Sequence, residues 1–210
     1  LKERKGLAAD IFRTALPYIF AAAGGLFTEL SGSLNIALEG QILAAAFWAV
    51  AVTALTGNPI LGFAAAMAAS SALALLTAIF SFRFRANVFI AALAANLLSI
   101  GVVSLFSTLL FSGSGVVRLP ADTGSYHLFF VAMSLVTLAG SWYIINMTPF
   151  GMRCRAAGLS EIVLYYRGIN PDLYRYASFL ISGVLCGIAG ACLAARIGAF
   201  VPNISAGRGW

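Results

Sequence analysis

Residues 29–40 read ELSGSLNIALEG, and they interrupt a chain that is apolar on both sides of them. The stretch contains two carboxylates, Glu29 and Glu39, and one amide, Asn35. Its residues 31–33, Ser-Gly-Ser, disfavour a continuous helix. In water such a mixture would need no explanation. In a bilayer each ionised or unpaired polar group costs several kcal/mol unless it is satisfied, so the fold depends on whether this stretch lies in a membrane.

The composition places the chain in a membrane. Hydrophobic residues make up 61% of the 210 residues and charged residues only 10%, whereas an ordinary soluble domain carries about 25% charged residues. Apolar runs long enough to cross a bilayer recur along the chain and lack the alternation of a membrane β-barrel. We therefore expect an all-α polytopic membrane protein with about five or six spans, in which residues 1–210 form a single transmembrane domain.

The cations of the chain, whose net charge is +6, lie at the ends of apolar runs and are expected to act as topology signals, with no nucleic acid as partner. The three cysteines are expected to stay reduced. Residues 1–13 are expected to form either an interfacial helix or a solvated leader. The expected spans are residues 14–30, 34–55, 60–82, 88–111, 127–147 and 174–197.

The distribution of Lys and Arg leaves two topologies open for the first two spans. With residues 148–173 in the cytoplasm, two full crossings would leave only six of the 13 Lys and Arg residues inside. One net crossing would also bring the N-terminal cations inside, giving ten of the 13. The positive-inside rule therefore favours a short or re-entrant first segment, with a broken helix near residues 31–35. Broken helices in membranes are buried in protein or line a wet cavity, and they often build transport sites.

Four polar residues of the apolar segments are candidates for a substrate pathway: Glu29, Asn35, Glu39 and Asn96. Acids within a membrane are functional candidates by default, and no Lys or Arg lies in the middle of an apolar segment to neutralise them. The competing interpretation is that these side chains brace the broken helix. Asn96 shares a helix face with Ser99, and helix-to-helix hydrogen bonding is the commoner explanation for such a pair.

The polar stretch 148–173 is basic, and its residues 159–166 are expected to form a short helix, with Ser160 as N-cap and Gly168 as the stop. It is either a docking helix for a partner protein or an ordinary basic loop. The following span carries a packing face of small residues, Gly183, Gly187 and Gly190.

Other chemistry is not indicated by the sequence. His127 has no second ligand at metal-binding spacing, so no metal site is expected. The sequence contains no P-loop, hydrolase or zinc-protease motif, so we expect no cofactor and no enzymatic activity in this chain.

Three stretches together resemble one family. Residues 32–40, GSLNIALEG, resemble the Asn-Ile-Gly-x-Glu-Gly signature of bacterial ATP-binding-cassette importer permeases of the branched-chain amino acid, ribose and nucleoside type. Residues 151–158, with Gly-Ile-Asn at 168–170 and the small residues of 182–191, resemble the cytoplasmic loop of that family and its next helix. Residues 206–210, AGRGW, resemble the motif that follows.

The resemblance implies a multi-pass permease subunit of the bacterial cytoplasmic (inner) membrane, nearest the nucleoside, simple-sugar or riboflavin subgroup. Its implied partners are two cytoplasmic ATPase subunits, a second permease subunit and a periplasmic or lipoprotein substrate-binding protein. Members of the family continue past the equivalent of residue 210, so the chain is expected to be a fragment of a longer permease. Residues 148–173 would be the coupling loop, with these residues serving ATPase coupling: Gly151, Arg153, Arg155, Ala156, Gly158, Glu161 and Gly168.

The chain departs from the family pattern in two places. Ala37 stands where a glycine is usual, and residues 164–167, LYYR, stand where the family is small and Ala-rich. The second departure would alter ATPase docking or mark a dissimilar permease partner. Two other functions stay open: a stand-alone secondary transporter or channel that uses Glu29 and Glu39, and a structural subunit without a pathway of its own.

Overall fold

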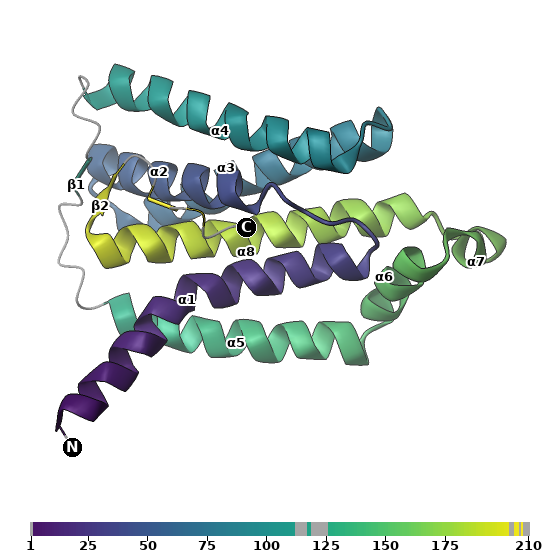
Figure 1. Ribbon diagram of the computed structural model, residues 1–210, viewed down its shortest axis with the longest axis horizontal. Coiled ribbons are helices and arrows are strands. Elements are labelled where there is room, and N and C mark those ends of the chain that lie inside the picture. Colours follow the sequence, from purple (N-terminus) through teal and green to yellow (C-terminus); the bar gives the residue numbers. More distant parts are fainter. Residues whose placement is uncertain (1, 112–116, 119–125, 202–203, 206, 208–210) are drawn as a thin grey trace.

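A computed structural model describes residues 2–111, 117–118, 126–201, 204–205 and 207. Its long helices lie side by side, and two short ones project at one end of the bundle (Figure 1). The predicted all-α polytopic fold is confirmed, with five helices long and apolar enough to cross a membrane among the described residues. The helices are α1 (Lys2–Leu30), α2 (Leu38–Thr56), α3 (Pro59–Ala78), α4 (Val88–Phe111), α5 (Tyr126–Met147), α6 (Pro149–Leu159), α7 (Glu161–Tyr166) and α8 (Pro171–Ile197), with a π-helical turn η1 (Ile79–Arg83) after α3.

Helix α8 is the centre of the bundle and packs on α1, α2 and α3. Its glycines allow the backbones to approach closely. A Cβ atom on Gly187 would lie 2.6 Å from the Cα of Met67 in α3, and one on Gly190 would lie 2.5 Å from the Cβ of Ala45 in α2. Gly183 lies equally close to α3. Small residues bring membrane helices together in this way because lipid gives no hydrophobic drive for their association.

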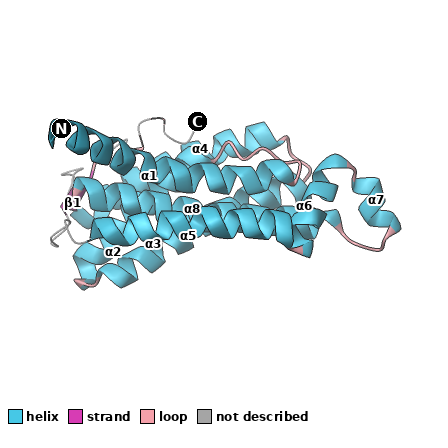
Figure 2. Cartoon of the chain, turned by 90° about the horizontal axis from the view of Figure 1, so that it is seen from below, coloured by secondary structure: helices cyan, strands magenta, loops and turns pink. Residues whose placement is uncertain are grey.

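Helix α1 runs along the whole length of α8. At one end, Arg196 in the last turn of α8 donates a hydrogen bond to the Thr14 hydroxyl at 2.9 Å. At the other end, Arg175 near the start of α8 donates to the Ser31 carbonyl at 3.4 Å. The two helices are therefore antiparallel, and α1 begins at the same end of the bundle as the turn at Gly57 between α2 and α3 (Figures 1 and 2).

The predicted re-entrant first segment is therefore wrong. Helix α1 crosses the bundle fully, and the non-helical residues 31–37 together with α2 return to the starting end. Residues 2–13 are helical and continuous with the rest of α1, and this first part of the helix projects beyond the bundle (Figure 1). The positive-inside rule gives the wrong topology here because the N-terminal cations lie at the end of the bundle opposite α6 and α7. Among the described residues, Lys and Arg are thus divided evenly between the two ends and give no topological bias.

At the end opposite α6 and α7, two short strands pair antiparallel. Strand β1 (Val117–Arg118) follows α4, and strand β2 (Ala199–Phe200) follows α8. Phe200 is buried against Phe47 of α2, with ring centroids 5.2 Å apart. This pairing directs the chain after α8 back toward the bundle.

The packing of α8 predicts that Gly190→Ala destabilises the protein. The added methyl group would overlap Ala45 of α2, and overpacking costs about 1–3 kcal/mol. Gly140→Ala in α5 is the matched control, because a Cβ there meets nothing within 4 Å. We expect thermal unfolding in detergent to give a lower midpoint for Gly190→Ala only. Equal midpoints for the two variants would contradict the packing described here.

The antiparallel course of α1 predicts the sidedness of single cysteines, whereas the native cysteines are all buried. Lys5→Cys and Thr56→Cys should react with a membrane-impermeant maleimide from the same side of the membrane. Arg167→Cys, in the exposed turn after α7, should react only from the other side. If Lys5→Cys and Arg167→Cys reacted from the same side of the membrane, the antiparallel course of α1 would be contradicted and the one-crossing topology supported.

Candidate functional site

A glycine turn ends α1 and begins the non-helical break at residues 31–37. Gly32 has φ +79°, and the N–H groups of Ser33 and Gly32 donate to the carbonyls of Thr28 (3.0 Å) and Glu29 (2.9 Å). This is a Schellman motif, which satisfies the last carbonyls of a helix. A Cβ on Gly32 would lie 2.8 Å from the Cα of Gly158 in α6. Glycine is therefore required by the backbone angle and by the contact with α6.

Asn35 fastens the middle of the break. Its Oδ1 accepts a hydrogen bond from the Ala37 N–H at 3.1 Å, which forms a local turn. Its Nδ2 donates to the Ser182 hydroxyl of α8 at 3.1 Å and, at 3.5 Å, to Gln41 of α2. The side chain is only 4% exposed. Asn35 therefore ties the break to two helices and is mostly covered by protein.

The start of α2 is capped by side chains of α4. Ala37, at the N-cap position, makes no side-chain cap bond. Instead Asn96 Oδ1 accepts from the Gly40 N–H at 2.8 Å, and its Nδ2 donates to the Ile36 carbonyl at 3.1 Å. The Ser99 hydroxyl donates to the Gly40 carbonyl at 2.7 Å. Asn96 thus satisfies a helix N-terminus that would otherwise leave a buried donor without a partner.

Glu39 contacts the distant end of the chain. Its Oε1 accepts a hydrogen bond from the Gly207 N–H at 2.9 Å. Ile204 and Ser205 are buried, so the chain after β2 lies against the bundle (Figure 1). Glu39 also lies in the first turn of α2, so its negative charge is stabilised by the positive end of the helix dipole. Glu39 therefore joins two motifs far apart in the sequence.

A cavity of about 440 Å³ opens between α1, the break and the start of α2. Glu29 is exposed at this cavity, and Asn35 also lines it. The structure thus brings together two of the four pathway candidates, whereas Glu39 and Asn96 are not lining residues. The remaining lining residues are apolar: Ala22, Gly25, Leu26, Leu34, Ile36 and Leu38.

The coupling candidates of α6 mostly hold that helix in place. Arg153 donates to the Tyr174 hydroxyl of α8 at 2.7 Å. Arg155 donates to the Ile145 carbonyl of α5 at 2.6 Å, and Gly151 lies so close that a Cβ would be 2.4 Å from the same oxygen. Helix α6 is therefore braced against α5 and α8, while Ala156 within it is partly buried.

The predicted short helix is present as α7 (Glu161–Tyr166), although Leu159 belongs to the end of α6. Ser160 occupies the N-cap position without a side-chain cap bond, and Gly168, with φ +70°, follows the last turn. Glu161 forms an ion pair with Arg175 of α8.

An apolar surface is exposed on this projecting end of the molecule. Leu164 is buried and anchors α7, whereas the apolar residues around it face outward. Figures 1 and 2 place α7 beyond the ends of the long helices, whereas α6 lies beside the end of α8. We call this the α7 surface, and its exposed members are Met152, Leu159, Ile162, Val163, Tyr165 and Tyr166.

Three side chains of the site were missed by the sequence reasoning. The sequence pattern indicates Arg175 only as a topology cation and Ser182 only as part of the family motif. Gln41 is fully buried, and its Nε2 has no hydrogen-bond partner within the described part of the chain. Its position in an apolar span, two residues after Glu39, was the signal that could have identified it.

Comparison with known proteins gives one family. A family model described as "Branched-chain amino acid transport system / permease component" matches residues 7–210. The chain is 29% identical to a guanosine ABC transporter permease protein of Bacillus subtilis, over 93% of this chain and 69% of that protein. It is 28% identical to a nucleoside ABC transporter permease protein of Lactococcus lactis (97% and 72%) and 24% identical to a ribose import permease protein of Escherichia coli (89% and 60%). No solved structure gives a significant match.

The cap that α4 supplies to α2 predicts that Asn96→Ala destabilises the protein. The Gly40 N–H would lose its acceptor while buried, which costs about 1–3 kcal/mol. Thr108→Ala, on the same helix, removes only a bond to its own helix at an exposed position and serves as the control. Thermal unfolding in detergent should separate the two variants. An Asn96→Ala protein as stable as Thr108→Ala would show that the cap is dispensable.

Proposed function

The chain belongs to the family of permease components of branched-chain amino acid transport systems, and from this premise we propose that it forms the translocation pathway of an ATP-driven importer for a small polar solute. As a permease of this kind it is a multi-pass protein of the inner membrane, and ATP hydrolysis resides in partner subunits. The observation that carries the proposal is the match to transporter permeases along residues 7–210.

The proposed solute is a nucleoside, a sugar or a riboflavin-like compound. The names of the relatives support the first two, since they include permeases for guanosine, nucleosides and ribose. The cavity beside the break supports the same class. Glu29 can accept hydrogen bonds from hydroxyl or N–H groups, while Leu26 and Leu34 offer apolar walls to a ring.

Residues 148–173, within the single transmembrane domain 1–210, are proposed to form the coupling loop on the cytoplasmic side. The exposed α7 surface is the kind of apolar patch that marks a docking site, and its proposed partner is an ATPase subunit. Because Arg153 and Arg155 fix α6 to its neighbours, a force on α7 would pass into the bundle. The whole transporter is proposed to contain two ATPase subunits, a second permease subunit and a substrate-binding protein.

Reconstitution tests this function. The permease, co-expressed with its ATPase subunits and incorporated into proteoliposomes with the binding protein, should take up labelled guanosine or ribose only when ATP is present. Uptake by the permease alone, driven by an ion gradient, would favour a stand-alone transporter instead.

The cavity predicts different effects for the two carboxylates. Glu29→Gln removes the charge that faces the cavity, and it should weaken uptake by about tenfold, since hydrogen bonds to charged groups contribute about 1.5–3 kcal/mol. Glu39→Gln keeps a carbonyl oxygen that can accept from the Gly207 N–H, so uptake should change little. The effect of each substitution is measured as the change in the KM of ATP-dependent uptake. A larger rise of KM in Glu39→Gln than in Glu29→Gln would indicate that Glu39, and not Glu29, faces the solute.

A further inference from the structure

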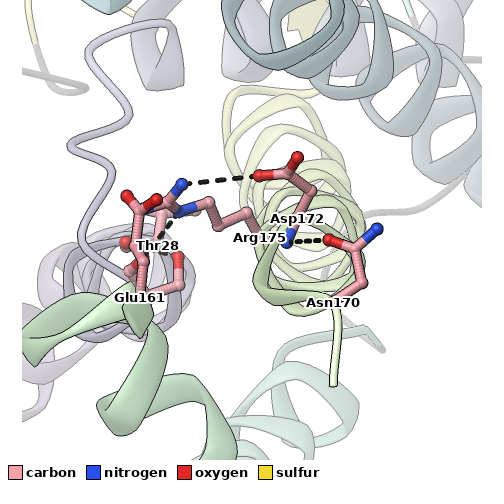
Figure 3. Close-up of polar contacts among 6 residues, drawn as sticks. Thr28, Glu161, Asn170, Asp172 and Arg175 are labelled. Atoms are coloured by element: carbon pink, nitrogen blue, oxygen red, sulfur yellow. Dashed lines mark hydrogen bonds and ion pairs between the residues drawn. The ribbon is translucent and has the colours of Figure 1, made fainter. Parts of the chain in front are cut away.

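Arg175 joins three segments of the chain at the end of the bundle that carries α6 and α7. Its guanidinium pairs with the Glu161 carboxylate of α7, and its Nε donates to the Ser31 carbonyl at the end of α1. Its Nη1 lies 3.4 Å from Asp172 in the first turn of α8. Figure 3 shows the guanidinium between the two carboxylates. The side chain is only 13% exposed, so these partners replace most of its contact with solvent.

The geometry requires an arginine. The guanidinium lies over the ring of Phe82 in η1, 5.8 Å from the ring centroid, while its edge bonds oxygens in three directions. A planar group with five fixed donors can stack and donate at once, whereas a lysine ammonium offers one compact charge. The carbonyl of Ser31 also lies at the negative end of the α1 dipole, where a cation is favourable.

A second contact joins the same two regions without charge. Gly158, near the end of α6, lies against the turn at Gly32, and a Cβ on Gly158 would be 2.5 Å from the Leu30 carbonyl oxygen. The two backbones therefore touch with no side chain between them. A displacement of α6 toward α1 would therefore press on the turn at Gly32, because the backbone of α6 at Gly158 already lies against it.

The break leads directly to the cavity. Ser31 follows Glu29 by two residues and precedes Asn35 by four, and both of these residues line the cavity. A route from the α7 surface to the cavity thus runs from Glu161 through Arg175 to Ser31. The other braces do not follow it, since Arg153 and Arg155 bind α6 to α8 and α5 only.

We propose that Arg175 is a positioning residue that transmits movement of α7 to the break at residues 31–37 and so to the cavity. The inference rests on the proposed function, in which α7 docks onto an ATPase subunit. When α7 moves away from the bundle, Arg175 pulls the end of α1 with it. When α6 moves toward the bundle, the Gly32–Gly158 contact pushes the end of α1.

The test uses the reconstituted transporter with its ATPase subunits. Hydrogen exchange is measured at α7 and at residues 31–37, with and without ATP, together with uptake per ATP hydrolysed. In the unmodified protein ATP should change exchange in both segments. In Arg175→Gln the change at α7 should remain, the change at 31–37 should disappear, and uptake per ATP should fall about fivefold or more, which is the lower range of coupling between sites.

Arg196→Gln is the matched control, because it removes an arginine that bonds α1 from the opposite end of α8. It should keep the response at 31–37. Arg175→Lys, which retains the charge without the fork, should give an intermediate response. An unchanged response at residues 31–37 in Arg175→Gln would overturn the inference. If ATP leaves α7 unaffected in the unmodified protein, the docking role of α7 is wrong, and the inference falls with it.

A second pair of variants covers the case in which Arg175→Gln does not assemble. Glu161 and Asp172 are both partly exposed partners of Arg175, but only Glu161 lies on another helix. Glu161→Gln should reduce uptake per ATP and weaken the response at 31–37, whereas Asp172→Asn should do neither. Equal behaviour of these two variants would contradict transmission through Arg175.

Discussion

Lipid offers no hydrogen bonds to a polypeptide backbone, and this constraint governs how residues 31–37 are held. The break has lost the internal bonds of a helix, so other elements must supply partners. Helix α8 supplies Arg175 at Ser31 and Ser182 at Asn35, while α4 supplies Asn96 at the start of α2. The positions of α4 and α8 relative to the break are therefore set by hydrogen bonds as well as by packing.

The same constraint separates the roles of the polar residues. Asn96 and Glu39 use their side chains on backbone groups of α2 and of Gly207, so they hold the break in shape. Glu29 faces a cavity, and Asn35 both lines that cavity and bonds to α8. Bracing and cavity lining are thus distributed among the residues, and Asn35 does both.

Much of the fold could be predicted because apolar runs and their Gly or Pro boundaries are local signals. The span 88–111 coincides with α4, and the span 60–82 differs from α3 and η1 by one residue at each end. The course of α1 could not be predicted, since it is fixed by Thr14 and Ser31 bonding to opposite ends of α8.

Polar residues within apolar spans are unfavourable in a membrane, and this made the candidate site residues predictable from the sequence. Their hydrogen-bond partners could not be predicted in this way. Asn96 bonds a residue 56 positions away and Glu39 one 168 positions away, and such pairs are set by tertiary structure alone. The contacts of Arg175 could not be predicted, because an arginine at the end of an apolar span is equally typical of a topology signal.

Structures of the whole transporter with and without ATP on its ATPase subunits would test the central claim most directly. The account predicts that the break at residues 31–37 and the end of α6 shift as one unit, with the Arg175–Ser31 and Gly32–Gly158 contacts kept in both states. A movement of α6 and α7 that leaves the break in place and opens these two contacts would contradict it.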